Sequence, residues 1–424
     1  MAIARSWPSL SLLLWARVSG LLVAMLVLSW ALGFRESFLS PAEESHIYAV
    51  LHPLLMVIGF IVLSGEAILV HKASGEWSMS SKKTVHLSLQ GVVLGLGVFG
   101  VWTKFQGFNG WVGNLYSLHS WMGFICLFLF AAQWVVGFLN FWHRGVEGRL
   151  VRAVVLPWHI FLGLYTYALA VVTAETGLLE KLTFLQNNHI NTNKRSIEAL
   201  LVNSLGLLLA LLCGIIILAA ISSPKSRHKH KHNIHLDSVY TKSNGAFTVF
   251  DPVLMTIAML AYKTVSGTRS FRKAVHLVLQ ALALCLSLIG FWAAFKFHND
   301  KGIDNFYSLH SWLGLACLSL FSIQWCIGFV TFWYPGGARN TRATLLPWHV
   351  FLGIYIYGLA IATAATGILE KLTFLQVNNV ISRYSTEALL VNLLGILIVG
   401  LGGIIILAVV SPSIHKGDPF RASE

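Results

Sequence analysis

The chain has 424 residues, of which 56% are hydrophobic and 11% are charged, and its formal net charge is +13. Soluble domains carry about 25% charged residues, so this composition excludes a soluble globular protein and predicts an integral membrane protein. Most lysines and arginines lie between long apolar runs, which favours contact with the bilayer and argues against a nucleic-acid partner. The five cysteines lie in apolar stretches without a Cys-x-x-Cys pair, so we expect neither a disulfide scaffold nor an iron–sulfur cluster.

Six nearly uncharged stretches of membrane-spanning length occupy the first half of the sequence. They lie at residues 10–34, 48–70, 84–102, 116–141, 153–177 and 198–221. The first stretch is too long for the core of a signal peptide, and we expect it to remain in the protein as a span. The basic loops lie on the side that the positive-inside rule assigns to the cytoplasm, which places the N-terminus there.

A polar linker with alternating Lys and His follows, and the chain then repeats itself. The segment Leu179–Gln186 returns unchanged at Leu369–Gln376, for example. The second copy has no counterpart of the first span, and its opening stretch is short. We therefore expect an all-α membrane protein with two tandem bundles of the six-helix type, the second of which lacks its first helix. The expected parts are a first domain at 1–222, a cytoplasmic linker at 223–245, a second domain at 246–412 and a cytoplasmic tail at 413–424.

Four histidines lie on four successive predicted spans, at two depths: His52 and His119 near one face, and His86 and His159 near the other. Three of them return in the second copy as His276, His310 and His349. A single intramembrane histidine often serves only as a hydrogen bond between helices, but matched and repeated histidines favour a functional site. No pair has the i, i+4 spacing of a zincin site, so ligands must come from facing helices.

Glycines follow four of these histidines at position i+4, where they lie on the same helix face as the imidazole. The four are Gly123, Gly163, Gly314 and Gly353. They leave space for a flat ligand such as a porphyrin, although packing between helices is an alternative that the pair Gly91 and Gly95 serves equally well. Two axial histidines would occupy both open coordination positions of a haem iron, which suits one-electron transfer. Gln90 or backbone carbonyls are expected to orient the free ring nitrogens.

The Ser-Leu-His-Ser-Trp motif at His119, the Leu-Pro-Trp-His motif at His159 and the four histidines on the middle spans resemble the cytochrome b561 family, especially its plant members. The resemblance implies that cytoplasmic ascorbate reduces an inner haem b, that the electron crosses to an outer haem, and that monodehydroascorbate or a ferric chelate is reduced outside. It also implies an inner haem between His86 and His159 and an outer haem between His52 and His119. The second half would hold one or two haems.

The resemblance does not decide whether the protein lies in the plasma membrane, the vacuolar membrane or another endomembrane. It also allows a homodimer as an alternative to a monomer.

Ascorbate is an anion, so its site needs cations beside the inner haem. The candidates are Lys82, Lys83 and Arg152, with Arg272, Lys273 and Arg342 in the second half. Ordinary membrane anchors are the alternative. We also count His298 among the substrate contacts, because Lys296-Phe-His298-Asn299 matches a family stretch near the acceptor, where the first copy has Gln106.

The second copy departs from the family where His52-Pro-Leu-Leu-Met in the first copy matches Asp251-Pro-Val-Leu-Met. A carboxylate is a poor ligand for low-spin haem, so we expect the second outer site, with His310 alone, to be empty or five-coordinate. The basic residues on both sides of 246–262 also strain the topology. Either this stretch lies at the interface or re-enters the membrane, which we favour, or the second copy is inverted. A third alternative is that the chain merges two neighbouring genes and lacks an exon.

Two other functions compete with electron transfer. In a proton-coupled transporter, intramembrane histidines would relay protons, and duplicated halves are common in transporters. Alternatively, the second half is a degenerate copy without activity of its own. Membranes that hold haem are red, whereas those of a transporter would be colourless.

Overall fold

The computed structural model describes residues 9–34, 50–72, 77–105, 115–142, 148–187, 193–222 and 250–411. Within these ranges every regular element is a helix, and ten helical segments are long and apolar enough to cross a membrane. Six of the ten belong to the first half and four to the second. The predicted all-α membrane fold is confirmed, whereas the linker at 223–245 and the tail at 413–424 lie outside the described residues.

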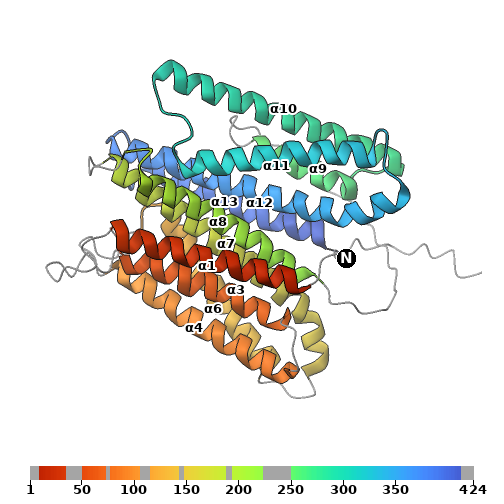
Figure 1. Ribbon diagram of the computed structural model, residues 1–424, viewed down its shortest axis with the longest axis horizontal. Helices are drawn as coiled ribbons and strands as arrows, with labels where there is room; N and C mark the ends of the chain where they lie inside the picture. Colours follow the sequence, from red (N-terminus) through yellow and green to blue (C-terminus); the bar gives the residue numbers. More distant parts are fainter. Residues whose placement is uncertain are drawn as a thin grey trace, which may run out of the picture.

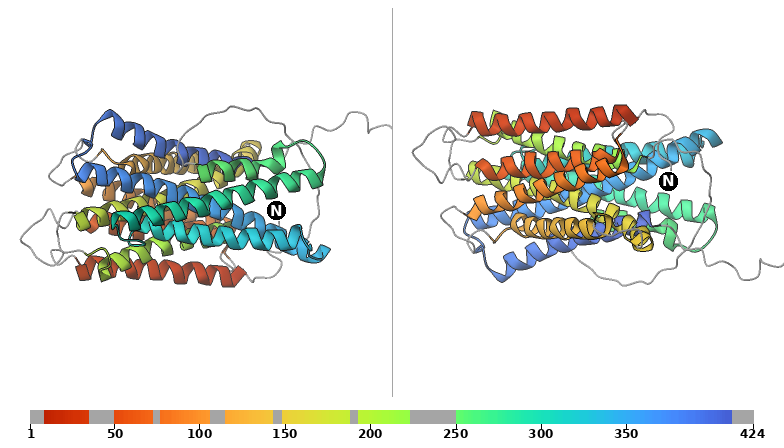
Figure 2. Two further views of the ribbon diagram at one scale, coloured as in Figure 1. Left: turned by 90° about the horizontal axis from the view of Figure 1, so that it is seen from above. Right: turned by 90° about the horizontal axis from the view of Figure 1, so that it is seen from below.

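The first half of the chain forms the lower part of the bundle in Figure 1. Its elements are α1 (Ser9–Phe34), the π-helical η2 (Leu55–Val62), α3 (Leu63–Leu69), η3 (Val70–Lys72), α4 (Met79–Phe105), α6 (Leu118–Gly137), η4 (Phe138–Trp142), α7 (Arg149–Asn187) and α8 (Ile197–Ile221). The second half contains α9 (Phe250–Thr264), α10 (Arg269–Lys301), α11 (Leu309–Phe332), α12 (Arg339–Val377) and α13 (Thr386–Val410). In both figures the long helices run roughly along one common axis (Figures 1 and 2).

The helices α7 and α12 are longer than the predicted spans, at 39 residues each. A helix of this length measures about 58 Å, which exceeds the roughly 30 Å of bilayer hydrocarbon. The predicted end of this span at residue 177 is therefore wrong, because α7 continues to Asn187. Leu179 and Leu182 are buried in this extension, and Glu180 accepts a hydrogen bond from Ser117 Oγ at the start of α6 (3.2 Å). These contacts keep the last turns helical.

Equivalent residues of the two halves exchange equivalent contacts. Asn203 Nδ2 on α8 donates to the backbone oxygen of Tyr307, and Asn392 Nδ2 on α13 donates to that of Tyr116 (2.8 and 2.7 Å). Each asparagine lies near the start of its helix, and each tyrosine precedes α6 or α11. The same ends of the two halves therefore meet at one face of the bundle. The alternative of an inverted second copy is wrong, because inversion would bring opposite ends together.

A second pair of exchanged contacts lies near the middle of the bundle. Tyr165 Oη donates to Val399 O at 3.2 Å, and Tyr355 Oη donates to Ala210 O at 3.1 Å. The two halves thus pack about a pseudo-two-fold axis that runs along the helices. This packing joins the two halves into one helical bundle.

The short helix α9 replaces only the later part of the span Val50–Lys72. Lys72 Nζ donates to Ser222 O and Lys263 Nζ donates to Ser411 O, so these lysines hold equivalent places (2.7 and 2.6 Å). His52 lies 20 residues before Lys72, but Asp251 lies 12 residues before Lys263. The predicted correspondence of Asp251 with His52 is therefore wrong by about two helical turns. The sequence has no other histidine between His235 and His276 that would fill the place of His52.

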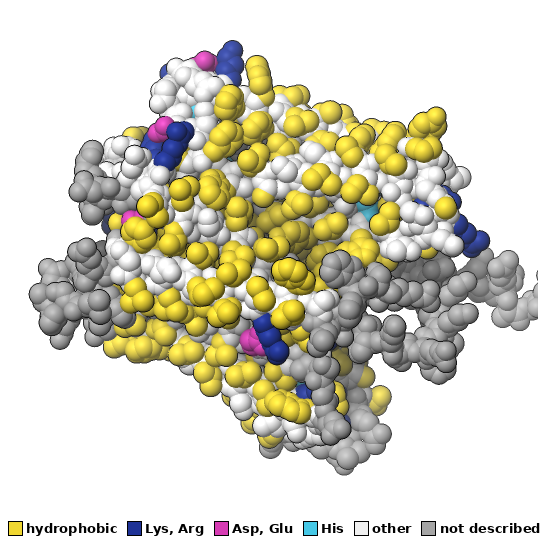
Figure 3. All heavy atoms as spheres, in the orientation of Figure 1, with side chains coloured by type: hydrophobic (Ala, Val, Ile, Leu, Met, Phe, Trp, Pro, Cys, Tyr) yellow, Lys and Arg dark blue, Asp and Glu magenta, His cyan; other side chains and the backbone are white. Residues whose placement is uncertain are grey.

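The missing first helix leaves a visible trace on α13. Leu394 and Leu401 are 41% and 44% exposed there, whereas Leu205 and Leu212 on α8 are 0% and 1% exposed. The difference arises because α1 packs along α8, and no described helix takes that place along α13. Figure 3 shows the molecule in the orientation of Figure 1. Hydrophobic side chains dominate the face in view, and lysines and arginines lie mostly near the helix ends. Such a surface suits lipid rather than water.

Candidate cofactor site

One pair of imidazoles faces across the first half near the end of α4. His52 lies at the start of the span Val50–Lys72, His119 lies in the first turn of α6, and their ring centroids are 6.1 Å apart. His52 Nδ1 lies 2.8 Å from Gly100 O, and His119 Nδ1 lies 2.9 Å from Thr173 O. A carbonyl oxygen can only accept a hydrogen bond, so Nδ1 carries the hydrogen and Nε2 of each ring is left to bind a metal.

A second pair faces across the same half near the start of α4. The ring centroids of His86 and His159 lie 6.4 Å apart, and His86 Nδ1 lies 2.8 Å from Ala67 O. The amide of Gln133 contacts both Nδ1 and the backbone oxygen of His159. The 14 residues between His86 and Gly100 correspond to about 20 Å along α4. The two pairs therefore lie in two tiers of the bundle.

The second half repeats one of these tiers. His276 and His349 face one another with ring centroids 6.3 Å apart, and His276 Nδ1 lies 2.8 Å from Ala258 O. His310 has the same backbone support, since its Nδ1 lies 3.0 Å from Thr363 O. Among the described residues, however, no histidine ring faces His310. The sequence supplies no partner at this place, because it has no histidine between His235 and His276.

The spacing of the three pairs fits one metal ion between two imidazoles. Nitrogen–metal bonds of about 2 Å place two coaxial imidazole centroids roughly 6 Å apart. The structure shows 6.1, 6.3 and 6.4 Å. No cluster of three or more metal-ligating side chains occurs among the described residues, so a bare metal ion lacks a full ligand set. A cavity of about 400 Å³ lies between His52 and His119 with a mainly apolar lining, which suits a flat iron porphyrin.

The glycines that make room for the imidazoles are not the ones expected. A Cβ on Gly177 would lie 2.6 Å from His119 Cε1, and one on Gly137 would lie 2.9 Å from His159 Cε1. Gly367 and Gly328 stand in the same relation to His310 and His349. All four lie on the helix that faces the histidine. They recur between the two copies, which is the signal that sequence inspection could have used.

The predicted i+4 glycines lie against other side chains. A Cβ on Gly163 would first meet Gln133 Nε2 at 3.4 Å, and one on Gly314 would first meet Thr363 Cγ2 at 3.4 Å. The equivalent glycines have equivalent neighbours. A Cβ on Gly123 would first meet Thr173 Cγ2 at 3.7 Å, and one on Gly353 would first meet Gln324 Nε2 at 3.9 Å. Gly123 does line the cavity beside His119. These glycines therefore border side chains other than the imidazoles, and the expectation that they leave space for a flat ligand stays a prediction.

The prediction for Gln90 as a partner of a ring nitrogen is also wrong. Its Oε1 accepts a hydrogen bond from Ser64 Oγ at 3.2 Å. The glutamines that contact ring nitrogens are Gln133 on α6 and Gln324 on α11, each 2.9 Å from the Nδ1 of its histidine. The backbone carbonyls that were expected to orient the other rings do so.

Aromatic rings cover the pair His86 and His159 and its counterpart. His71 lies 5.0 Å from His86 between ring centroids, and Tyr262 lies 5.8 Å from His276 in the equivalent place. Sequence inspection singled out neither. The equivalence of His71 with Tyr262 agrees with that of Lys72 with Lys263, and it supports the revised register of α9.

The predicted ascorbate cations lie near the starts of α4, α7, α10 and α12, and His298 lies apart from them. Lys82 and Lys83 lie in the first turns of α4, and Arg152 lies in the first turns of α7. In the second half Arg272 Nη1 donates to Tyr262 O at 3.4 Å, Lys273 follows it, and Arg342 lies in the first turn of α12. His298 lies at the opposite end of α10, where its Nδ1 is 3.1 Å from Asn305 Oδ1. The structure therefore separates His298 from these cations, and Gln106 lies outside the described residues.

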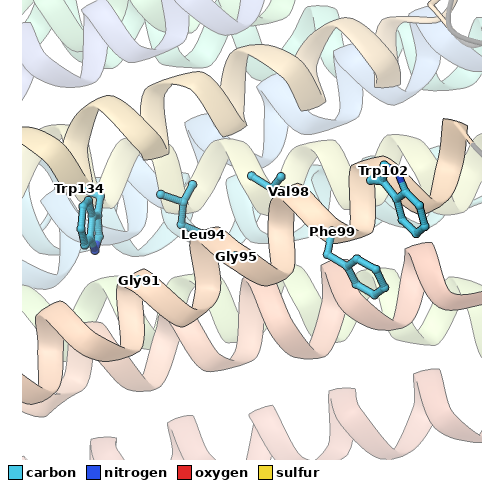
Figure 4. A pocket seen from close by; sticks show the side chains of 7 residues that line it. All are labelled: Gly91, Leu94, Gly95, Val98, Phe99, Trp102 and Trp134. Carbon is cyan, nitrogen blue, oxygen red and sulfur yellow. The ribbon is translucent and has the colours of Figure 1, made fainter.

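A further hollow lies on the outer side of α4 (Figure 4). Gly91, Gly95 and Trp134 contribute to this open groove of about 540 Å³, whose lining is almost wholly apolar. No described side chain that lines it titrates near neutral pH, so it holds no chemistry of its own. A Cβ on Gly95 would meet nothing within 4 Å, so this glycine does not pack against a described helix.

Comparison with known proteins places both halves in one group. Residues 51–185 and 247–375 each match the family described as eukaryotic cytochrome b561. The chain is 68% identical over 169 residues to transmembrane ascorbate ferrireductase 2 of Arabidopsis thaliana, which covers 38% of this chain and 74% of that protein.

Two more relatives extend the comparison. The chain is 56% identical over 228 residues to probable transmembrane ascorbate ferrireductase 4 of Arabidopsis thaliana, which covers 53% of this chain and 91% of that protein. It is 42% identical over 181 residues to ascorbate-specific transmembrane electron transporter 2 of Zea mays, with 41% and 76% covered. Two matches to one family in tandem fit a duplication of the whole unit.

Proposed function

The chain belongs to the eukaryotic cytochrome b561 family, and we propose that it carries single electrons from ascorbate across a membrane through b haems between its histidine pairs. The observation that carries this proposal is the spacing of the three facing imidazole pairs. When bound, an iron porphyrin supplies one-electron chemistry. The paired histidines would hold such a group from both sides, so substrates would exchange electrons with it without binding to the iron.

The two tiers define the two ends of the path. Lys83 and Arg152 lie on the helices that carry His86 and His159, so the ascorbate anion is bound and oxidised at this end, which the positive-inside rule assigns to the cytoplasm. His52 and His119 serve the opposite end, where monodehydroascorbate or a ferric chelate takes the electron. The names of the similar plant proteins include ascorbate and ferric reduction. They support ascorbate as the electron donor and a ferric complex as an electron acceptor.

Haem stoichiometry tests the proposal directly. We expect two haems in the first half and one firmly bound haem in the second, between His276 and His349, because no histidine of the described residues faces His310. The pyridine haemochrome assay on the full chain should therefore give about three haems per chain, and ascorbate should produce the reduced α-band. Four haems would contradict the assignment of His310. Colourless membranes would contradict electron transfer and favour the transporter.

Neutralising the proposed ascorbate cations should weaken substrate binding without loss of haem. We expect Lys83→Gln and Arg152→Gln each to raise the KM for ascorbate about fivefold to tenfold, the effect of losing one charge-assisted hydrogen bond at a partly exposed site. Steady-state kinetics with the haem spectrum recorded in parallel measure this. Lys72→Gln is the matched control, because Lys72 Nζ already donates to Ser222 O. An unchanged KM in both variants would make these residues membrane anchors.

A further inference from the structure

The cavity between His52 and His119 opens at a mouth that both halves build. Lys104 and Lys181 of the first half line it, and so does Arg383, which lies in the turn between α12 and α13 of the second half. The Arg383 guanidinium lies 4.6 Å from the centre of the Tyr116 ring, a cation–π distance. A site in one half thus includes a side chain of the other half.

The interface between the halves holds Arg383 in this place. Asn392 Nδ2, which follows Arg383 by nine residues, donates to Tyr116 O at 2.7 Å. Ser385 Oγ caps the N-terminus of α13 by accepting from Ala388 N. A Cβ on Gly395 would lie 2.6 Å from Leu118 Cδ2, so α13 approaches α6 closely. These contacts fix the start of α13 against α6 and so hold the turn with Arg383 that precedes it.

The mouth carries more positive than negative charge. Lys104, Lys181 and Arg383 are exposed there, and Glu180 is the buried carboxylate beside them. Glu180 already accepts hydrogen bonds from Ser117 Oγ and from the Tyr116 phenol. Burial and the nearby Glu180 raise the pKa of Tyr116, so the phenol stays neutral. Three cations against one engaged carboxylate favour an anionic ligand.

The equivalent place in the second half has a different charge balance. Lys194 of the first half lies over the Tyr307 ring at 4.7 Å, as Arg383 lies over Tyr116. Asp304 Oδ2 lies 3.3 Å from Lys194 Nζ and offsets its charge. The first half has Gly113 where the repeat places Asp304, so its sequence supplies no such carboxylate. The second half also keeps Lys296 and Lys371 in the places of Lys104 and Lys181, so Asp304 makes its positive excess smaller than that of the first mouth.

We propose that Arg383 completes an anion-binding site at the mouth of the cavity in the first half, together with Lys104 and Lys181. The ligand class is a small anion with carboxylate or similar oxygen or nitrogen acceptors, which a guanidinium binds in a fixed geometry. Two sources offer such a group: a soluble anionic electron acceptor, and the carboxylates of a porphyrin seated between His52 and His119. The inference rests on the proposed function, because both sources belong to that electron path.

The test compares acceptors of opposite charge on the full-length chain. Ferricyanide is a trianion and hexaammineruthenium(III) is a trication, and each takes one electron from the ascorbate-reduced protein. We expect Arg383→Gln to raise the KM for ferricyanide roughly tenfold without raising that for the ruthenium complex, and Arg383→Lys to recover most of the loss. Lys194→Gln, at the equivalent place in the other half, should leave the KM for ferricyanide within about twofold.

Redox titration of the same variants distinguishes the two sources. If the porphyrin carboxylates are the ligand, Arg383→Gln lowers the midpoint potential of the haem that His52→Ala removes, because loss of a positive charge favours ferric iron. Both KM values then stay unchanged. The proposal is overturned if Arg383→Gln leaves the ratio of the KM values and all midpoint potentials at wild-type values. Failure of the proposed function would look different, because wild-type protein itself would show no ascorbate-reducible haem.

Discussion

Replacing His159 with alanine should remove one haem from the first half and leave the haem between His52 and His119 in place. His159 and His86 face one another at 6.4 Å between ring centroids, and each ring is oriented by its own partner. Loss of one imidazole leaves a single ligand, which does not hold the iron in its low-spin state. The tier near the other end of α4 shares none of these contacts.

The measurement combines the pyridine haemochrome assay with reduced-minus-oxidised spectra of the full chain. The haem content should fall by one per chain, and ascorbate should reduce the remaining haem of the first half far more slowly. His71→Ala is the matched control. The His71 ring lies 5.0 Å from the His86 ring between centroids, but His71 is not a member of one of the three facing pairs. Full haem content and normal ascorbate reduction in His159→Ala would refute the pairing.

The sequence predicted the spans of the first half and the four histidines at two depths because helical periodicity and apolar length determine both. Sequence comparison failed at Asp251. The match of Pro, Leu and Met there outweighed the fact that Asp251 lies fewer residues before His276 than His52 lies before His86. The correct register depends on which carbonyl His276 contacts and on the bond of Lys263 to Ser411. Such contacts between helices leave no trace in a pairwise comparison of the two copies.

The candidate site shows the same limit. Position i+4 on a helix identifies neighbours on one face of that helix, so Gly123 and Gly163 were expected beside the imidazoles. The close neighbour of His119 is Gly177 on α7, which depends on how α6 and α7 pack. Arg383 was missed for a related reason. It reaches Tyr116 through the pseudo-two-fold packing of the halves, which a repeated sequence does not specify.

The second large effect is expected from a single methyl group on α7. A Cβ on Gly177 would lie 2.6 Å from Cε1 and 2.9 Å from Nδ1 of His119. The ring has little room to retreat, because Nδ1 is bound to Thr173 O at 2.9 Å. Gly177→Ala must therefore turn the imidazole or displace α7, at a cost of about 1–3 kcal/mol. We expect the protein to lose the haem between His52 and His119 and to keep the one between His86 and His159.

Two glycine variants separate this steric effect from other consequences of the substitution. Gly367→Ala brings the same methyl group to 2.7 Å from His310 Cε1, but within the described part of the chain His310 faces no second histidine, so the number of firmly bound haems should not change. Gly95→Ala points into open space and should be neutral or slightly stabilising, since alanine favours a helix over glycine by about 1 kcal/mol. Haem content and redox spectra of the three variants, measured side by side, check the prediction. A full haem content in Gly177→Ala would mean that His119 is not held at the position in which it would bind iron.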